Sequence, residues 1–384
     1  MHSKKILYFQ YTDPAIGYPP LEHSSEILAN KGWQVLFLGI TFANNVFSLK
    51  SHTNIKIEKL KFVKAKWSQK INFIWFNIWV FFWAWHWRPD WIYASNSTSA
   101  PAVIVLNLFY RDRIIYHEHD SPDTKNPVPT LFMRFIYWAR VQIAQRVKTC
   151  VLPNHERVKI FEKEIGIDGK TVCVWNCPLL SEVRKPDSRR SKDVTVLYHG
   201  SLVPQRLPMG LLEALAKIGS GIKLRVTGYE AEDYADYPRR LKEQALRLGI
   251  SERVEFSSAQ TRAELLDMCH ECDIGIAFIL SDDPDVNMRH MLGASNKPFD
   301  YLACGLAVLV SDLPDWKAMF VGPGYGLACD PKSSESIAGA LRWFLGHPKE
   351  MQAMGEKGRQ KILSDWNYET QFMPVFEKIN AACD

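Results

Sequence analysis

The sequence predicts an α/β protein with two domains, each built on a doubly wound parallel sheet, and three observations carry this prediction. A chain of 384 residues, 47% hydrophobic and 23% charged, is long enough for two domains of ordinary size. Short apolar runs alternate with helical stretches in both halves, as in parallel βαβ units. A polar stretch with prolines separates the two halves, as expected of a linker.

The first half contains short apolar runs that are typical of buried strands. A helical stretch over 22–31 separates the first two runs, which is the spacing of a parallel strand–helix–strand unit. The expected strands are 4–11, 33–40, 55–62, 91–94, 113–117 and 149–152. Together they predict a first, Rossmann-like domain over 1–180.

The second half repeats this alternation after a linker. Residues 181–193 are rich in charge around Pro186, which predicts an exposed connection. The expected strands are 194–200, 222–228, 253–258, 273–279 and 307–312. They predict a second Rossmann-like domain over 194–365, and the chain beyond Pro331 reads as helical to its end.

Charge and cysteine usage exclude several classes of protein. The net charge of +5 is modest and no basic tail is present, so nucleic acid is not the expected partner. The eight cysteines are scattered, which favours reduced thiols, and the Cys269–Cys272 pair has no second pair at the spacing of a zinc site. The apolar run 6–9 is too short for a signal peptide. These observations predict a cytoplasmic protein.

An aromatic segment over 71–87 stands out because it is almost wholly apolar and contains five tryptophans. It is shorter than the roughly 20 residues of a membrane-spanning helix, which predicts a buried or interfacial helix. Seven lysines and one glutamate precede it in 50–70. Cations beside tryptophans suit an anionic membrane surface, here formed by 50–88 and allowing peripheral association with the inner face of the cell membrane. A solvated basic face or an aromatic core helix would give the same pattern.

Two segments of the second half have the features of an anion site. His199–Pro208 follows a strand and leads into a helix, so its backbone N–H groups and Arg206 predict a seat for a diphosphate. The alternative is an ordinary turn with a solvated arginine. In 295–314, Lys297 and Asp300 share one helix face. There the carboxylate would accept hydrogen bonds from ribose hydroxyls, and the helix N-terminus would contact phosphate or sugar oxygens. The alternative is that Lys297 and Asp300 form a surface ion pair.

The order of these segments resembles the retaining glycosyltransferases of family 4 and their close relatives, over most of the chain. That family has the GT-B fold, in which two Rossmann-like domains face a central cleft. Its Gly-Arg-Leu turn is similar to Gly200, Ser201 and Leu202, with serine replacing arginine and Arg206 supplying the basic charge. The resemblance implies that these residues bind the donor phosphates.

The family also has two glutamates eight positions apart, and here only the second half of that motif is matched. Asp300 stands at the second glutamate and Leu292 at the first. The sequence is closer to a branch with a Ser-Asn-Lys-x-x-Glu-Tyr pattern, whose matching residues are Ser295, Asn296, Lys297, Asp300 and Tyr301. The resemblance implies that Ser295, Asn296, Lys297 and Asp300 bind the donor.

In the first domain, the resemblance implies three further site residues. Gly17 stands in the loop that approaches the donor phosphates, although Tyr18 replaces the family's second glycine. His119 and Asp120 resemble the residues that flank the donor sugar; a structural histidine at a strand end is the alternative. The tail, 366–384, is similar to the helix that crosses back onto the first domain.

The resemblance implies transfer of a sugar from a nucleotide-diphosphate sugar to a glycan or lipid-linked acceptor with retention of configuration, in bacterial polysaccharide or envelope glycan synthesis. No cofactor or metal is expected, because Arg206, Lys297 and helix N-termini would stabilise the leaving diphosphate. His119, Asp120 and Arg206 are the expected catalytic residues. Asp283-Pro284-Asp285 has the letters of a metal motif but lies in a polar, loop-like stretch.

Two other functions stay open at this point. A sugar-nucleotide epimerase of similar fold would need its own acid and base, and no separate carboxylate pair in the sequence fits those roles. A catalytically impaired, nucleotide-sugar-binding protein that docks on membranes is favoured by the missing first glutamate and by Ser201.

Overall fold

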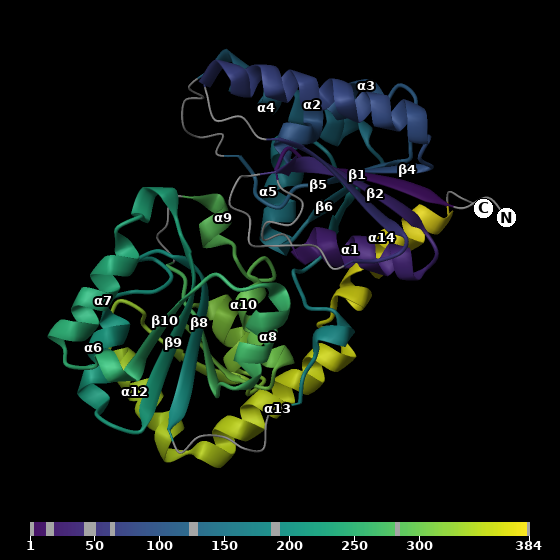
Figure 1. Ribbon diagram of the computed structural model, residues 1–384. Coiled ribbons are helices and arrows are strands. Elements are labelled where there is room, and N and C mark those ends of the chain that lie inside the picture. The colour runs from purple at the N-terminus through teal and green to yellow at the C-terminus, as the bar shows by residue number, and fades with distance from the viewer. Residues whose placement is uncertain are drawn as a thin grey trace. The chain divides into compact units, whose positions relative to one another are not determined.

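The computed structural model describes residues 4–12, 19–41, 51–61, 66–122, 130–185, 193–280 and 285–381. The chain forms two compact units. The first unit comprises Met1–Asn176, Asp285–Ala294 and Tyr368–Asp384, and the second comprises Cys177–Pro284 and Ser295–Asn367. Each unit contains one parallel sheet (Figure 1). The segment Asp285–Ala294 lies with the first unit, whereas the sequence predicted that all of 194–365 belongs to the second domain.

The sheet of the first unit has seven strands in the order β3-β2-β1-β4-β5-β6-β7. The strands are β1 (Lys5–Phe9), β2 (Gln34–Thr41), β3 (Ile55–Lys61), β4 (Trp91–Ser95), β5 (Ile114–His117), β6 (Thr149–Leu152) and β7 (Thr171–Cys173). All pairings between them are parallel. The order reverses after β3, as in doubly wound sheets.

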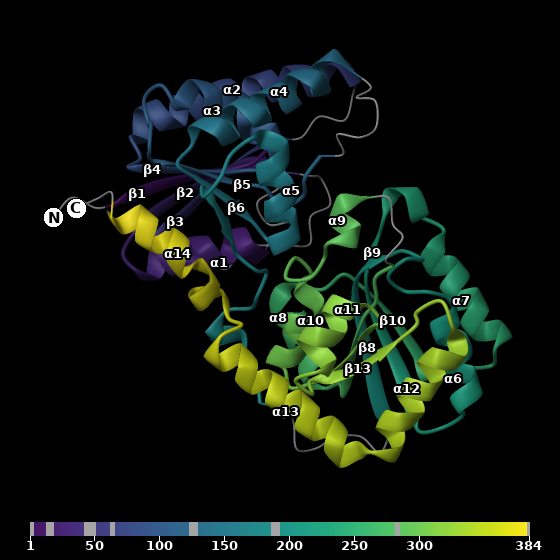
Figure 2. The same cartoon turned by 180° about the vertical axis from the view of Figure 1, so that it is seen from behind.

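Helices cover both faces of this sheet (Figures 1 and 2). The helices are α1 (Pro19–Asn30), α2 (Lys66–Trp87), α3 (Ala100–Leu106), α4 (Leu131–Arg146), α5 (His155–Ile165), the short α9 (Val286–Arg289) and α14 (Tyr368–Ala381). On one face lie α2, α3 and α4, and on the other lie α1 and α14. Because both faces are covered, β4 and β5 are buried along their whole length and β1 along all but its first residue.

The second unit has six parallel strands in the order β10-β9-β8-β11-β12-β13. The strands are β8 (Val194–Leu202), β9 (Ile222–Glu230), β10 (Val254–Ser258), β11 (Ile274–Ala277), β12 (Ala307–Ser311) and β13 (Gly326–Cys329). The helices are α6 (Gly210–Ile218), α7 (Tyr237–Arg247), α8 (Arg262–His270), α10 (Asn296–Ala303), α11 (Pro314–Trp316), α12 (Ser334–Gly346) and α13 (Pro348–Ser364). Figure 2 shows α6, α7 and α12 on one face, with α8, α10 and α13 on the other.

These two sheets confirm the predicted fold class of two doubly wound, Rossmann-like domains. Two strands were not predicted. Strand β7 has three residues and is only half-buried, and β13 has four residues beginning with glycine. Neither contains the long apolar run by which a buried strand is recognised.

The aromatic segment forms α2, which presents two different faces. Phe73, Phe76, Val80 and Ala84 point into the core, whereas the other face is exposed. Within the described parts of the chain, no helix combines the length and apolarity that crossing a bilayer requires. The predicted helix is therefore confirmed, and it combines a core face with an exposed apolar face.

Candidate active site

The end of β8 is built for close approach of a cation to the backbone. Gly200 has φ of 118°, a conformation that residues with a side chain rarely adopt. A Cβ on Gly200 would lie 2.9 Å from Lys297 Nζ, and a Cβ on neighbouring Gly228 would lie 1.9 Å from the Gly200 carbonyl oxygen. Glycine at 200 therefore allows the side chain of Lys297 to lie against β8, and glycine at 228 allows the backbone of β9 to approach Gly200.

A second cation joins Lys297 at the same end of β8. The Nη1 atom of Arg206 donates to Ser201 Oγ at 3.2 Å. Burial, and then repulsion from Arg206, lower the pKa of Lys297 to about 7 against the opposing effect of Asp300. The structure thus brings Gly200, Ser201, Arg206 and Lys297 together, and an anion here would relieve the repulsion between the two cations.

Ser295 and Asn296 mark the beginning of α10 beside this cluster. Ser295 occupies the N-cap position, but its side chain makes no capping hydrogen bond to the helix. Backbone N–H groups in the first turn of a helix lack partners within the helix and favour anions. The start of α10 therefore adds a third positive element to the predicted diphosphate seat.

Asp300 lies on α10 and is held mainly by Arg262, a residue outside every motif of the sequence. Its side chain is 1% exposed, which excludes the alternative of a surface ion pair. Its Oδ1 accepts from Arg262 Nη2 at 2.7 Å, and its Oδ2 lies 3.6 Å from His199 Nε2. Arg262 in turn makes two bonds to Glu182, at 2.8 and 3.0 Å. The carboxylate at position 300 is thus fixed by an ion-pair chain.

His199 completes this group of side chains as a neutral imidazole. Burial lowers its pKa well below 6.5, and the positive charges of Lys297 and Arg262 lower it further. A neutral ring can donate or accept a hydrogen bond without adding charge. The second unit therefore combines two cations, a buried carboxylate and a neutral histidine around the end of β8.

The lowered pKa of Lys297 predicts that diphosphate binding depends on pH. Above pH 7 the amine of the free protein loses its proton, so binding an anion must recover it and affinity should fall, approaching about tenfold per pH unit. We expect nucleoside diphosphate affinity, measured by calorimetry, to weaken from pH 7 to 9 with uptake of up to one proton. Lys297→Arg stays charged and should lose this dependence. An equal slope in both proteins would contradict the assignment.

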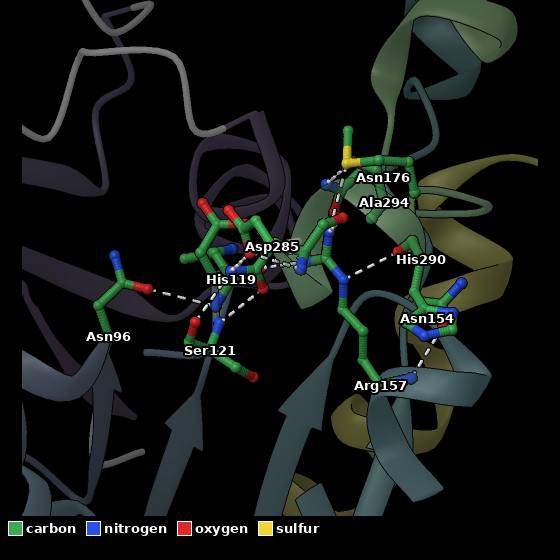
Figure 3. A network of polar contacts seen from close by, with 12 residues as sticks. Asn96, His119, Ser121, Asn154, Arg157, Asn176, Asp285, His290 and Ala294 are labelled. Carbon is green, nitrogen blue, oxygen red and sulfur yellow. Dashed lines mark hydrogen bonds and ion pairs between the residues drawn. The ribbon is translucent and has the colours of Figure 1, made fainter. Parts of the chain in front are cut away.

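In the first unit, His119 and Asp120 lie just beyond β5, after Glu118, and are held by hydrogen bonds to their backbone and to the Asp120 side chain. The His119 N–H donates to Asn96 Oδ1 at 3.2 Å. Arg157 Nη1 donates to the His119 carbonyl oxygen at 2.8 Å and to Asp120 Oδ1 at 3.3 Å. Figure 3 shows the guanidinium of Arg157 among these groups. The two predicted residues thus share one partner.

The imidazole of His119 is neutral at physiological pH. Burial, and then the positive charge of Arg157, lower its pKa to about 3. Its ring centroid lies 3.9 Å from that of His117. The side chain is therefore suited to hydrogen bonding with an uncharged hydroxyl rather than to ion pairing.

A buried ion-pair network holds Glu118, the residue between β5 and His119. Arg140 of α4 makes two hydrogen bonds to Glu118, at 2.6 and 2.7 Å, and two to Glu164, at 2.8 and 3.5 Å. Tyr116 Oη donates to Glu118 Oε2 at 2.7 Å. The side chains of Arg140 and Glu118 are both 0% exposed. The network therefore holds the chain at the end of β5 against α4.

Some predicted residues lie outside the described ranges. Gly17 is one of them, as are Asp283 and Pro284. Asp285 is described: its Oδ1 caps α9 by accepting from the Asn287 N–H at 2.8 Å. Within the described ranges, no three His, Cys, Asp or Glu side chains form a group that could hold a metal ion.

Part of the chain is similar to a known family. Residues 181–361 match the family described as glycosyl transferases group 1. No curated protein matches the whole sequence significantly.

Solved structures match nearly the whole chain at low sequence identity. Sucrose-phosphate synthase from Thermosynechococcus elongatus has 15% identity and a TM-score of 0.75, over 99% of this chain and 100% of its own. Anabaena HepE in complex with UDP and glucose has 16% identity and a TM-score of 0.74, over 98% and 100%. WaaG, a glycosyltransferase involved in lipopolysaccharide biosynthesis, has 13% identity and a TM-score of 0.70, over 97% of this chain and 99% of its own. These similarities confirm the GT-B fold.

Proposed function

We propose that this protein is a nucleotide-sugar-dependent glycosyltransferase that retains anomeric configuration and needs no metal. The observation that carries the proposal is that two basic side chains, Lys297 and Arg206, lie close together beside Gly200. Lys297 also stands in the first turn of α10. Two cations and a helix N-terminus form a seat for a diphosphate. The match of 181–361 to the family of glycosyl transferases group 1 and the UDP complexes of the HepE neighbour support a sugar nucleotide as its ligand.

In the proposed reaction, the bond between the anomeric carbon and the diphosphate oxygen breaks, and the diphosphate leaves with the electron pair. The acceptor hydroxyl oxygen then bonds to the anomeric carbon on the face that the diphosphate left, and its proton passes to the departing phosphate oxygen. Arg206, Lys297 and the start of α10 stabilise the negative charge that develops on the diphosphate. His119, as a neutral donor, and Asp120 bind sugar hydroxyls, and Asp300 accepts from the ribose.

The activity test is release of nucleoside diphosphate from UDP-, GDP-, ADP- and dTDP-glucose, with and without a bacterial lipid extract. We expect one donor to be consumed faster with the extract and to give a glycolipid that keeps the donor's anomeric configuration. The substitution His119→Ala should lower this rate. Addition of EDTA should leave the rate unchanged. Consumption of no donor would contradict the proposal and favour a nucleotide-sugar-binding protein without turnover.

A lipid-linked acceptor is the second part of the proposal, because the first unit exposes an apolar surface. This surface lies on α2, the turn after α3, and α4, which cover one face of the sheet (Figures 1 and 2). Its members are Ile71, Ile74, Trp75, Ile78, Phe82, Trp85, Leu108, Phe109, Leu131, Phe135 and Trp138. So large a set of exposed apolar side chains marks an interaction site.

Positive charge next to this surface favours an anionic membrane as its partner. Lys61 and Lys70 are exposed near the N-terminal part of α2. Exposed Lys56 lies near its C-terminal part, with Nζ 5.0 Å from the ring centroid of Trp83. Tryptophans and lysines with an apolar helix face are typical of helices lying in the membrane interface. We therefore place the acceptor in an envelope or polysaccharide pathway that uses lipid carriers.

Vesicle flotation tests this surface. We expect the protein to float with vesicles containing phosphatidylglycerol and to bind weakly to phosphatidylcholine alone. The double variant Trp75→Ser, Trp85→Ser should lose flotation, whereas Leu246→Ser, an equally exposed side chain on α7, should keep it. Equal flotation of both variants, or a change in oligomeric state with the tryptophan variant alone, would overturn the membrane assignment.

A further inference from the structure

The segment Asp285–Ala294 lies in the first unit, although its neighbours in sequence on both sides belong to the second. It contains α9 and packs next to His119 and Ser121 (Figure 3). Nothing in the sequence motifs predicts this placement. The contacts that hold the segment there come from a small number of buried polar side chains.

Arg157 of α5 makes the central contacts. Its Nε donates to the His290 carbonyl oxygen at 2.9 Å, and its Nη2 donates to the Asn287 carbonyl oxygen at 2.6 Å. The remaining nitrogen, Nη1, reaches His119 and Asp120 as described above. With its side chain 2% exposed, the guanidinium is fixed between the segment and the predicted catalytic residues.

Asn287 makes a second, independent connection to the same turn. Its Oδ1 accepts from the Ser121 N–H, and its Nδ2 donates to the Ser121 carbonyl oxygen, both at 2.9 Å. The side-chain amide thus pairs with the backbone of Ser121 as a neighbouring strand would. Removing Asn287 therefore breaks two hydrogen bonds to the residue that follows Asp120.

The far end of the segment is anchored as well. Asn176 donates through its backbone N–H to the Gly293 carbonyl oxygen at 2.8 Å, and through Nδ2 to the Ala294 carbonyl oxygen at 2.6 Å. The Nδ2 of Asn154 donates to the Leu292 carbonyl oxygen. A Cβ on Gly293 would lie 2.6 Å from the Trp175 ring, so the backbone approaches the first unit closely. The segment is thus held at both ends.

We propose that Arg157 and Asn287 are positioning residues for sugar transfer, which hold the His119–Ser121 turn in its reactive orientation through the Asp285–Ala294 segment. The inference rests on the proposed function and adds two residues to it. Arg157 fixes the carbonyl of His119 and the carboxylate of Asp120, and Asn287 fixes Ser121. A small displacement of groups that contact a reacting sugar costs rate strongly, because the reacting atoms must be aligned within a narrow range.

The test compares Arg157→Met, Arg157→Lys and Asn287→Ala with Lys159→Ala as a control. Lys159 lies on the same helix, with a side chain 71% exposed. UDP release from UDP-glucose gives kcat and KM, with GDP-, ADP- or dTDP-glucose in its place if wild type consumes that donor instead. Amide hydrogen exchange at 119–121 reports the order of the turn without reference to activity.

We expect kcat to fall about tenfold or more in Arg157→Met and Asn287→Ala, as a displacement of reacting groups predicts. The KM for the donor should stay within about twofold, because the proposed diphosphate contacts are untouched. Arg157→Lys should recover part of kcat, and amides 119–121 should exchange faster in both deficient variants. Lys159→Ala should match wild type in every measurement. Because Asn287→Ala removes only one side chain of α9, it keeps the test available if Arg157→Met does not fold.

Two results would overturn the inference while leaving the proposed function intact. One is unchanged exchange at 119–121 in both variants, and the other is faster exchange with kcat equal to that of active wild type. Wild-type protein that consumes no nucleotide sugar would instead remove the proposed function, and the positioning role with it. Failure of the proposed function is distinguishable from failure of the positioning role, because it is seen in the wild-type protein without any substitution.

Discussion

Replacement of Arg140 by methionine is expected to lower the free energy of unfolding of the first unit by about 3–5 kcal/mol, since the change leaves a buried carboxylate without its cation. Arg140 and Glu118 are both fully buried, and three hydrogen bonds from the guanidinium to Glu118 and Glu164 are 2.6–2.8 Å long. In a domain of this size such a loss corresponds to a fall in Tm on the order of 10 °C. Thermal and urea unfolding measure it.

A control on the same helix separates the buried charge from the loss of any arginine. Arg146 is exposed and bonds to Gln142, so Arg146→Met should leave Tm close to that of wild type. Combining Arg140→Met with Glu118→Gln should recover part of the loss, because the unpaired charge is then removed. Equal stability of the two methionine variants would show that the network does not stabilise β5.

Replacement of Arg262 by methionine is the second change with a large expected effect. The variant leaves the buried carboxylate of Asp300 without its 2.7 Å partner and releases Glu182. We expect a loss of about 3 kcal/mol of unfolding free energy in the second unit. Nucleoside diphosphate affinity should also fall about tenfold, because Asp300 is no longer fixed in orientation.

Arg239→Met provides the matched control for this prediction. Arg239 is also paired with two acids, Asp236 and Glu243, but at the surface of α7, where ion pairs contribute little. Both unfolding and affinity should stay near wild type in this variant. If Arg262→Met kept full affinity while losing stability, Asp300 would not contact the ligand.

Most of the fold could be predicted from the sequence because its signals are local. The strands predicted over 194–200, 222–228 and 307–312 are short segments rich in apolar and β-branched residues. Strands β8, β9 and β12 appear where those segments predict them. In α2, by contrast, nearly every residue is apolar, so no contrast along the helix shows which face is buried. Only packing distinguishes exposed Trp85 from buried Ala84.

Some residues of the candidate site could likewise be predicted from the sequence, and others could not. Gly200, Arg206 and Lys297 could be predicted because each belongs to a segment at the end of a strand or the start of a helix. Arg157 could not, since its partner His290 lies 133 residues further along the chain. Such pairings depend on how the chain returns to the first unit, and no local pattern of residues reports that path.

The most direct test of the central claim is thermal stabilisation by UDP-, GDP-, ADP- and dTDP-sugars, comparing wild type with Asp300→Ala and Arg206→Ala. A ligand that binds only the folded state raises Tm, and the shift grows with the logarithm of the ratio of ligand concentration to Kd. We predict that one nucleotide sugar stabilises wild type and that either substitution abolishes the shift. Stabilisation of wild type by none of them, or an equal shift in all three proteins, would contradict a nucleotide-sugar site at the end of β8.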